Sequence, residues 1–107
     1  MKKSVAYRDN LLKDLMSPAE CVFYLNAAIE SGDRGAFLMA LRNVIEAQSQ
    51  MTIVARQAHI HRVSLHKMLA KGGNPSAGSL ISLFRVLGIR LKLEKYHKDP
   101  KNLRKAA

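Results

Sequence analysis

Basic and hydrogen-bonding side chains are concentrated in the stretch Thr52 to Leu69, TIVARQAHIHRVSLHKML. They are interleaved with apolar residues at the positions that face one another across a pair of short helices. The apolar set is Val54, Ala58, Ile60, Leu65 and Met68. The polar set is Arg56, His61, Arg62, Ser64, His66 and Lys67. Guanidinium, ammonium and imidazole groups on one outer face can bind phosphates and base edges, so this pattern predicts a DNA-binding surface.

The same stretch predicts a helix-turn-helix. Thr52 is expected to cap a short helix over residues 53–58, followed by a tight turn over 59–61 and a second helix over 62–69 or 62–70. Ala55 falls where the two helices cross most closely, a contact that tolerates only a small side chain. The alternative is that the polar residues are only the solvated face of an amphipathic helix pair.

The second helix is the one expected to enter the major groove of DNA. The predicted base contacts are His61, Arg62, Val63, His66 and Lys67, and the predicted phosphate contacts are Thr52, Arg56, Ser64 and Lys71.

The distribution of charge favours the DNA interpretation over the solvated face. The 107-residue chain has a formal charge of +10, and residues 1–46 contribute nothing to it because six basic and six acidic side chains cancel. From Ala47 to Leu93 there is no Asp or Glu but there are seven Lys or Arg, a formal charge of +7. Such a basic patch on a helix-turn-helix is the electrostatic footprint of duplex binding. A membrane surface is a weaker match, because neither a long basic amphipathic helix nor a lipidation signal is present.

Length and composition predict one cytoplasmic domain without a cofactor. No apolar run approaches the roughly 18 residues that span a bilayer, and the amino terminus lacks the apolar core of a signal peptide. The single cysteine, Cys21, cannot form an internal disulfide and is expected to be a buried thiol.

A metal enzyme or metal sensor is a rival class, because His59, His61 and His66 lie close together, with His97 farther along the chain. We expect no metal site, since no carboxylate lies between Glu46 and Glu94 to support these imidazoles. The same lack of a carboxylate argues against acid–base catalysis, so the chain is not expected to be an enzyme.

A helix is predicted to begin at Ser17. The hydroxyl side chain can act as the cap, Pro18 suits the first helical position, and Glu20 completes a capping box. This helix is expected to run to about Ser31 and to end at Gly32. Residues 1–16 precede it as an arm, which forms either a short helix or a segment that becomes ordered on a partner.

Two more helices flank the predicted helix-turn-helix. Asp33 can cap a helix over residues 34–48, whose apolar stripe would cover the motif. After it, the glycine, asparagine and proline of residues 70–75 predict a turn. Ser76 or Ser79 then caps the last helix, which brings the predicted total to five.

A strand is predicted after Gly88, which should stop the last helix. Residues 89–94 alternate strictly between apolar and charged side chains. A lone strand in a helical chain leaves its backbone groups unpaired, so it is expected to pair with the same strand of a second subunit or, alternatively, with the amino-terminal arm. The predicted dimer contacts are Ile89, Leu91 and Leu93. Residues 95–107 are expected to form a basic flexible tail.

The chain from about Leu15 to Leu93 resembles HigA-like addiction-module antidote proteins (antitoxins) of the Xre or lambda-repressor helix-turn-helix class. The resemblance rests on the succession YLNAAIESGDRGAFLMALRNVIEAQ, MTIVARQAHIHRVSLHKML and GNPSAGSLISLFRVLGIRLKL. It implies a mainly α, five-helix lambda-repressor-like domain over residues 17–94. It further implies a homodimer that binds double-stranded operator DNA and neutralises a RelE/HigB-like toxin. One departure is His59, where such proteins usually have glycine, because that turn position often needs a positive φ.

Two questions stay open at the level of sequence. A stand-alone Xre-type repressor without a toxin would share every DNA-binding feature. If a toxin is bound, its basic character, which the resemblance implies, favours the neutral first 46 residues as its docking surface. Apolar side chains there would be either its anchors or parts of the core: Tyr7, Leu11, Leu12, Leu15 and Tyr24.

Overall fold

The computed structural model describes residues 5–15 and 17–96, which form six helices and no strand. The helices are α1 (Val5–Asp14), α2 (Pro18–Glu30), α3 (Arg34–Gln48), α4 (Met51–Gln57), α5 (Arg62–Leu69) and α6 (Ala77–Val86). The prediction of a mainly α fold is confirmed, and the five predicted helices are α2 to α6. The sixth, α1, takes the helical alternative for the first residues, and the amino-terminal end of the chain before residue 5 lies outside the described ranges.

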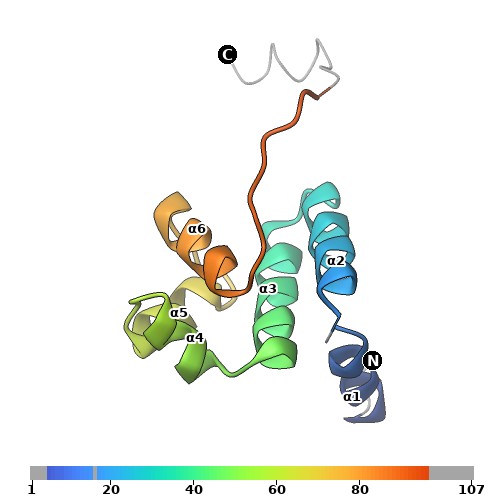
Figure 1. Ribbon diagram of the computed structural model, residues 1–107, viewed down its shortest axis with the longest axis horizontal. Coiled ribbons are helices and arrows are strands. Elements are labelled where there is room, and N and C mark those ends of the chain that lie inside the picture. The colour runs from blue at the N-terminus through green and yellow to red at the C-terminus, as the bar shows by residue number, and fades with distance from the viewer. Residues whose placement is uncertain (1–4, 16, 97–107) are drawn as a thin grey trace.

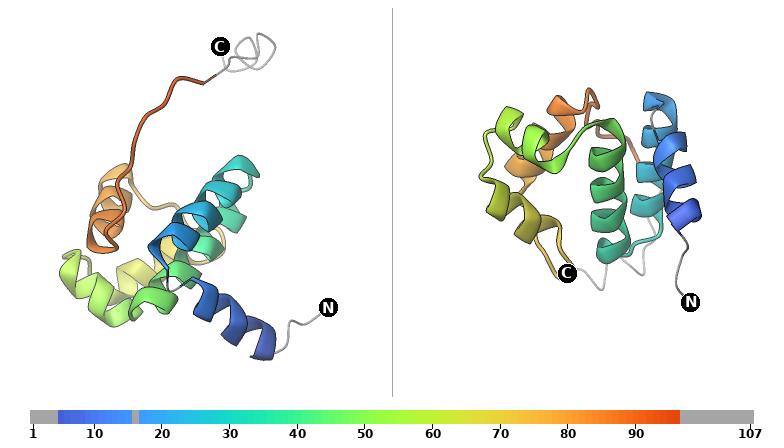
Figure 2. Two further views of the ribbon diagram at one scale, coloured as in Figure 1. Left: turned by 45° about the vertical axis from the view of Figure 1, so that its right-hand side comes forward. Right: turned by 90° about the horizontal axis from the view of Figure 1, so that it is seen from below.

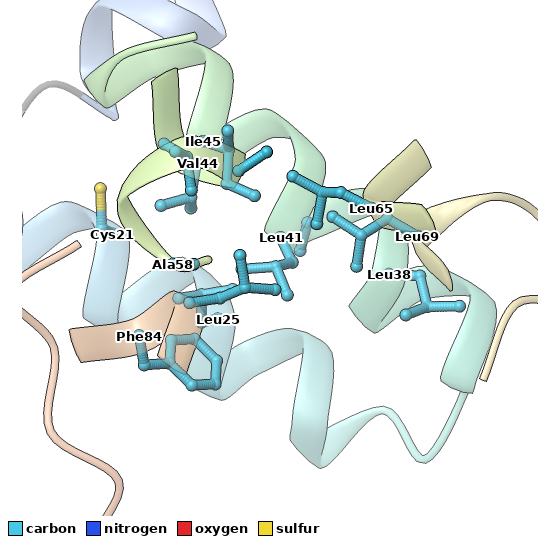
Figure 3. Packing of buried hydrophobic residues seen from close by; sticks show 14 of the residues in the cluster. Cys21, Leu25, Leu38, Leu41, Val44, Ile45, Ala58, Leu65, Leu69 and Phe84 are labelled. Atoms are coloured by element: carbon cyan, nitrogen blue, oxygen red, sulfur yellow. The ribbon is translucent and has the colours of Figure 1, made fainter. Parts of the chain in front are cut away.

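Helix α3 lies in the middle of the fold. It contacts α1 and α2 on one side and α4 and α5 on the other, while α6 packs on α4 (Figure 1). Its residues Leu41, Val44 and Ile45 have no solvent exposure, because they lie on the stripe of three- and four-residue spacings that faces the other helices (Figure 3). Phe37 of α3 and Phe84 of α6 add a tilted aromatic pair with ring centroids 6.4 Å apart.

The helix ends agree only in part with the predicted caps. Gly32 ends α2 with a φ of 73°, and the Asp33 carboxylate accepts hydrogen bonds from the backbone N–H groups of Gly35 and Ala36. The Ser76 hydroxyl accepts one from the N–H of Ser79. Ser17 occupies the cap position of α2 but its side chain makes no capping hydrogen bond, so the predicted capping box is wrong.

The predicted cap of α4 is also wrong. The N–H of Val54 donates to the carbonyl of Gln50, so the helical hydrogen bonds begin two residues before Thr52. Met51 packs against the core from the first helical position. That contact extends the helix toward the amino terminus and places Thr52 inside its first turn.

A small polar network joins the amino-terminal segment to α2 and α3. The carbonyl oxygen of Leu15 accepts hydrogen bonds from the Cys21 thiol and from Nε2 of Gln48, both at 2.8 Å. Cys21 is the buried thiol that the sequence predicted. Burial raises the pKa of this thiol, and the negative charge of Glu20 adds to the rise, whereas the hydrogen bond from Gln48 partly offsets it. The net shift is upward, so the thiol stays protonated.

The predicted strand over residues 89–94 does not form in the single chain. Gly88 ends α6 with a φ of 74°, and the N–H of Ile89 donates back to the carbonyl of Phe84. Figures 1 and 2 show that the following residues, up to 96, leave the helical body as an extended segment. Because strand structure requires ladder hydrogen bonds to a neighbour, an isolated extended segment is not a strand. The tail predicted from residue 95 lies outside the described residues from residue 97 onward.

Candidate nucleic-acid interface

A tight turn joins α4 to α5 and fixes the angle between them. The N–H of His59 donates to the carbonyl of Arg56, and the N–H of Ile60 donates to that of Ala55 at 2.9 Å. This pair of hydrogen bonds is a Schellman motif, which requires a left-handed residue after the helix. His59 fills that position with a φ of 58°, the only non-glycine in the described residues with a positive φ. The positive φ predicted for this position is therefore present, with histidine in place of glycine.

Helix α5 is held against α3 by one side of its surface. Leu65 and Leu69 are completely buried, and Met68 is half-buried against the same core. At its carboxyl end, the Arg42 guanidinium of α3 donates a hydrogen bond from Nη1 to the carbonyl of Leu69. A cation at this end also interacts favourably with the helix dipole. The buried leucines and the Arg42 hydrogen bond together hold α5 in place, so it is a platform for its outward side chains.

The outward surface of α5 and the residue directly before this helix carry the five side chains that were predicted to contact bases. Arg62, His66 and Lys67 are exposed, and Val63 is 48% exposed on the side away from Leu65 and Leu69. His61, the fifth, is also exposed and lies directly before the helix. These residues offer a guanidinium, an ammonium, two imidazoles and an apolar contact, which are the groups that read base edges in a major groove.

His61 has a structural role that the sequence did not predict. It is the N-cap of α5, and its ring Nδ1 accepts a hydrogen bond from the N–H of Val63 at 3.3 Å. A neutral imidazole that accepts at Nδ1 carries its proton on Nε2. His61 therefore supports the first turn of α5 and presents an N–H donor to the outside. Its sequence position directly before a short helix was the available signal, but histidine is not a usual N-cap residue.

The four predicted phosphate contacts are exposed around this platform. Thr52 lies in the first turn of α4, Arg56 in its last turn, Ser64 on α5 and Lys71 in the loop that follows. Within residues 47–93, all of which the structure describes, there is no carboxylate to oppose the seven basic side chains. All of the predicted base and phosphate contacts are therefore exposed, on α4, on α5 and in the residues directly before and after α5.

The histidines do not form a metal site in the described part of the chain. No group of three or more His, Cys, Asp or Glu side chains there is close enough to hold an ion. His97, the fourth histidine, lies outside the described residues. None of the described helices is long and apolar enough to cross a membrane.

The predicted dimer contacts lie on the extended segment after α6. Ile89 is half-buried and packs on the core, whereas Leu91 is 50% exposed and Leu93 is 100% exposed. The segment borders a groove of about 430 Å³ whose other side is formed by Val22 and Ile29 of α2. Apolar side chains are therefore available on this segment and on the α2 side of the groove for a second chain to cover.

The proposed toxin anchors near the amino terminus are mostly parts of the core. Leu15 is buried, and Leu11 packs against the core from α1. Tyr24 is half-buried, and its hydroxyl accepts a hydrogen bond from Nδ2 of Asn43 at 2.9 Å. Leu12 is half-buried and Tyr7 is 48% exposed. A more exposed aromatic than Tyr7 is Phe23 of α2, at 75%, which the sequence interpretation overlooked.

Comparison with known proteins places this arrangement in a family. The model of a family described as "Probable addiction module antidote protein" matches residues 8–95, which include α2 to α6 and the extended segment. The chain belongs to this family. A relative from Haemophilus influenzae, described as an uncharacterized protein, is 27% identical over 85 residues, which cover 79% of this chain and 87% of the relative. No solved structure gives a significant match.

Membership of the addiction-module antidote family bears on two predictions. The family description supports the general prediction of an antitoxin role and implies a toxin partner only in general terms. It is a regulatory family and not an enzyme family, so the prediction that the chain is not an enzyme is confirmed.

Proposed function

We propose that this antidote protein is a DNA-binding antitoxin of the HigA-like, Xre helix-turn-helix class, which acts in the cytoplasm. It neutralises a RelE/HigB-like toxin by protein–protein binding and represses their shared operon as a dimer. The observation that carries the DNA-binding part is the outward surface of α5. There, side chains of the kinds that can contact bases are exposed on a helix whose opposite side is buried in the core, and residues 47–93 contain no carboxylate.

In this proposal α4 and α5 are the two helices of the motif, and α5 enters the major groove. Arg62, at the first turn of α5, and Lys67, farther along it, would reach base edges, with Val63 between them. Arg56, Ser64, Thr52 and Lys71 would bind the phosphates on either side. The short helices and the turn at His59 hold the base contacts and the phosphate contacts at fixed positions relative to one another.

Replacing Arg62 by alanine is expected to relax base preference. A guanidinium in a bidentate contact with guanine contributes about 1–3 kcal/mol of discrimination, so Arg62→Ala should weaken binding to the cognate operator by that amount and to a scrambled duplex much less. Arg56→Ala is the matched control, because loss of a phosphate contact weakens binding to both duplexes alike. Titrations of both variants on both duplexes measure this, and equal losses for Arg62→Ala would make it a phosphate contact.

Dimerisation in this proposal uses the extended segment. Residues 89–94 of two chains would pair as strands, which satisfies their backbone hydrogen bonds and covers Leu91 and Leu93. Leu93 is fully exposed on an extended backbone. Pairing with a second chain would cover its side chain and satisfy the backbone hydrogen bonds, which supports this assignment. The dimer would hold two α5 helices for two half-sites about one helical turn of DNA apart.

Co-expression tests the antitoxin part of the proposal. The small protein encoded by the reading frame next to this chain's gene should arrest growth when expressed alone, and this chain should restore growth. Failure to restore growth, or a neighbouring protein that does not arrest it, would favour the stand-alone Xre-type repressor. The DNA-binding features support that alternative equally, whereas membership of an antidote family favours the antitoxin.

A further inference from the structure

The outer face of α2 carries an exposed aromatic ring. The chain has three phenylalanines, of which Phe37 and Phe84 pack against each other, whereas Phe23 is 75% exposed. One helical turn away on either side of Phe23 lie Ala19 and Ala27, both exposed. Alanine side chains are too short to cover a neighbouring ring, so these two residues leave the Phe23 ring exposed.

Two acidic side chains lie on the same side of α2 as this ring. Glu20 lies three residues before Phe23, about one helical turn away, and Glu30 lies seven residues after it, about two turns away. Both are on the same side of the helix as Phe23, and both are exposed. From Asp14 to Asp33 the chain has four acidic residues and no Lys, Arg or His. In a chain with a formal charge of +10, α2 is therefore a helix without basic side chains.

We infer that this α2 face, defined by Ala19, Glu20, Phe23, Ala27 and Glu30, binds a basic protein, which is the toxin partner of the proposed function on which this inference rests. The partner would present an apolar pocket for the Phe23 ring and basic residues around it for the two glutamates. Aromatic side chains at the centre of an interface dominate its free energy of binding, and complementary charges at the rim accelerate association.

The position of α2 also allows the partner and DNA to bind together. Figure 1 and the right-hand view of Figure 2 both place α3 between α2 and the pair α4 and α5. The α2 face is distinct from the groove that α2 shares with the extended segment, because Phe23 is not among the groove residues, whereas Val22 and Ile29 are. Successive helical residues point about 100° apart, so Phe23 and Val22 face different neighbours.

The test measures affinity for the purified product of the adjacent reading frame. Phe23→Ala should weaken binding by about 30-fold or more, as expected for an aromatic anchor. Met39→Ala is the matched control, because Met39 is a half-exposed apolar residue of α3 outside the α2 face, and its loss should change affinity by less than about threefold. Phe23→Ala should keep wild-type operator binding, which shows that the variant is folded.

A charge-reversal pair locates the acidic part of the surface. Glu20→Lys and Glu30→Lys, each as a single variant, should slow association more than Asp9→Lys on α1 does, and the difference should shrink in high salt. A larger effect of Asp9→Lys would overturn the inference in favour of α1. A change in the oligomeric state of the chain, caused by Phe23→Ala and measured without the partner, would also overturn the inference. The α2 face would then bind a second copy of this chain. If wild type binds this partner but Phe23→Ala binds equally well, only the inference fails; if wild type does not bind, the proposed function fails with it.

Discussion

Leu91→Lys is expected to separate the proposed dimer into monomers in solution. Leu91 is half-exposed on the extended segment and would be covered when two such segments pair. A lysine ammonium at this position cannot be buried between two chains without a large desolvation cost. Size-exclusion chromatography with light scattering at micromolar concentration measures the change directly.

The same variant should lose almost all specific operator binding. A monomer presents one α5 to one half-site, so affinity should fall by roughly 10³-fold toward the level of salt-sensitive, non-specific binding. The added positive charge would by itself strengthen binding to DNA, so a loss cannot be an effect of charge. Glu94→Gln is the control, because it also adds one unit of charge but lies on the opposite side of the alternating segment. A Leu91→Lys protein that stays dimeric would refute this account of the dimer.

Gly73→Ala is expected to destabilise the fold more than any other single methyl addition at a glycine. A Cβ atom at this position would overlap the carbonyl oxygen of Met68 and lie 2.6 Å from its carbonyl carbon and 2.8 Å from the carbonyl oxygen of Lys67. These are backbone atoms at the end of α5, which Arg42 and the buried Leu69 hold in place. The loop or the helix end must therefore move, at a cost of about 1–3 kcal/mol or more in the free energy of unfolding.

Thermal unfolding measures this cost, and a loss of 2 kcal/mol would lower the Tm by roughly 10 °C. Gly78→Ala is the matched control. Its Cβ would meet only the Ser76 hydroxyl oxygen, at 3.9 Å, and alanine in a helix is favoured over glycine by about 0.5–1 kcal/mol. The two variants should thus shift the Tm in opposite directions. An unchanged Tm for Gly73→Ala would mean that the end of α5 is not rigid.

The helices were predictable where local chemistry and packing agree. Asp33 supplies a side-chain cap and an apolar stripe follows it, so the predicted range of α3, residues 34–48, is the observed one. The start of α4 was misplaced because Thr52 is a better cap by residue type than Gln50. The packing of Met51 against the core instead places the start of α4 at Met51. The strand predicted after Gly88 does not form in the described chain, because the alternating pattern supplies no neighbouring strand for ladder hydrogen bonds.

The candidate interface was predictable in its composition and less so in its roles. The alternation of apolar and polar residues from Val54 to Met68 was sufficient to separate the buried side of α5 from its exposed side. It did not indicate that His61 caps the helix or that Arg42 holds its far end, because these contacts depend on atomic distances. Phe23 was overlooked because a phenylalanine in a helix is ordinarily assigned to the core.

The most direct test of the central claim, that α5 reads operator DNA, is the ratio of two dissociation constants for the wild-type protein. One is for a duplex from the promoter region of its own gene and the other for a scrambled duplex of the same length and composition, both measured by fluorescence anisotropy at about 0.15 M salt, where surface charges are screened. We predict that the promoter duplex binds at least roughly 10³-fold more tightly. Equal dissociation constants for the two duplexes would contradict the claim, because the basic surface would then bind phosphates without reading bases.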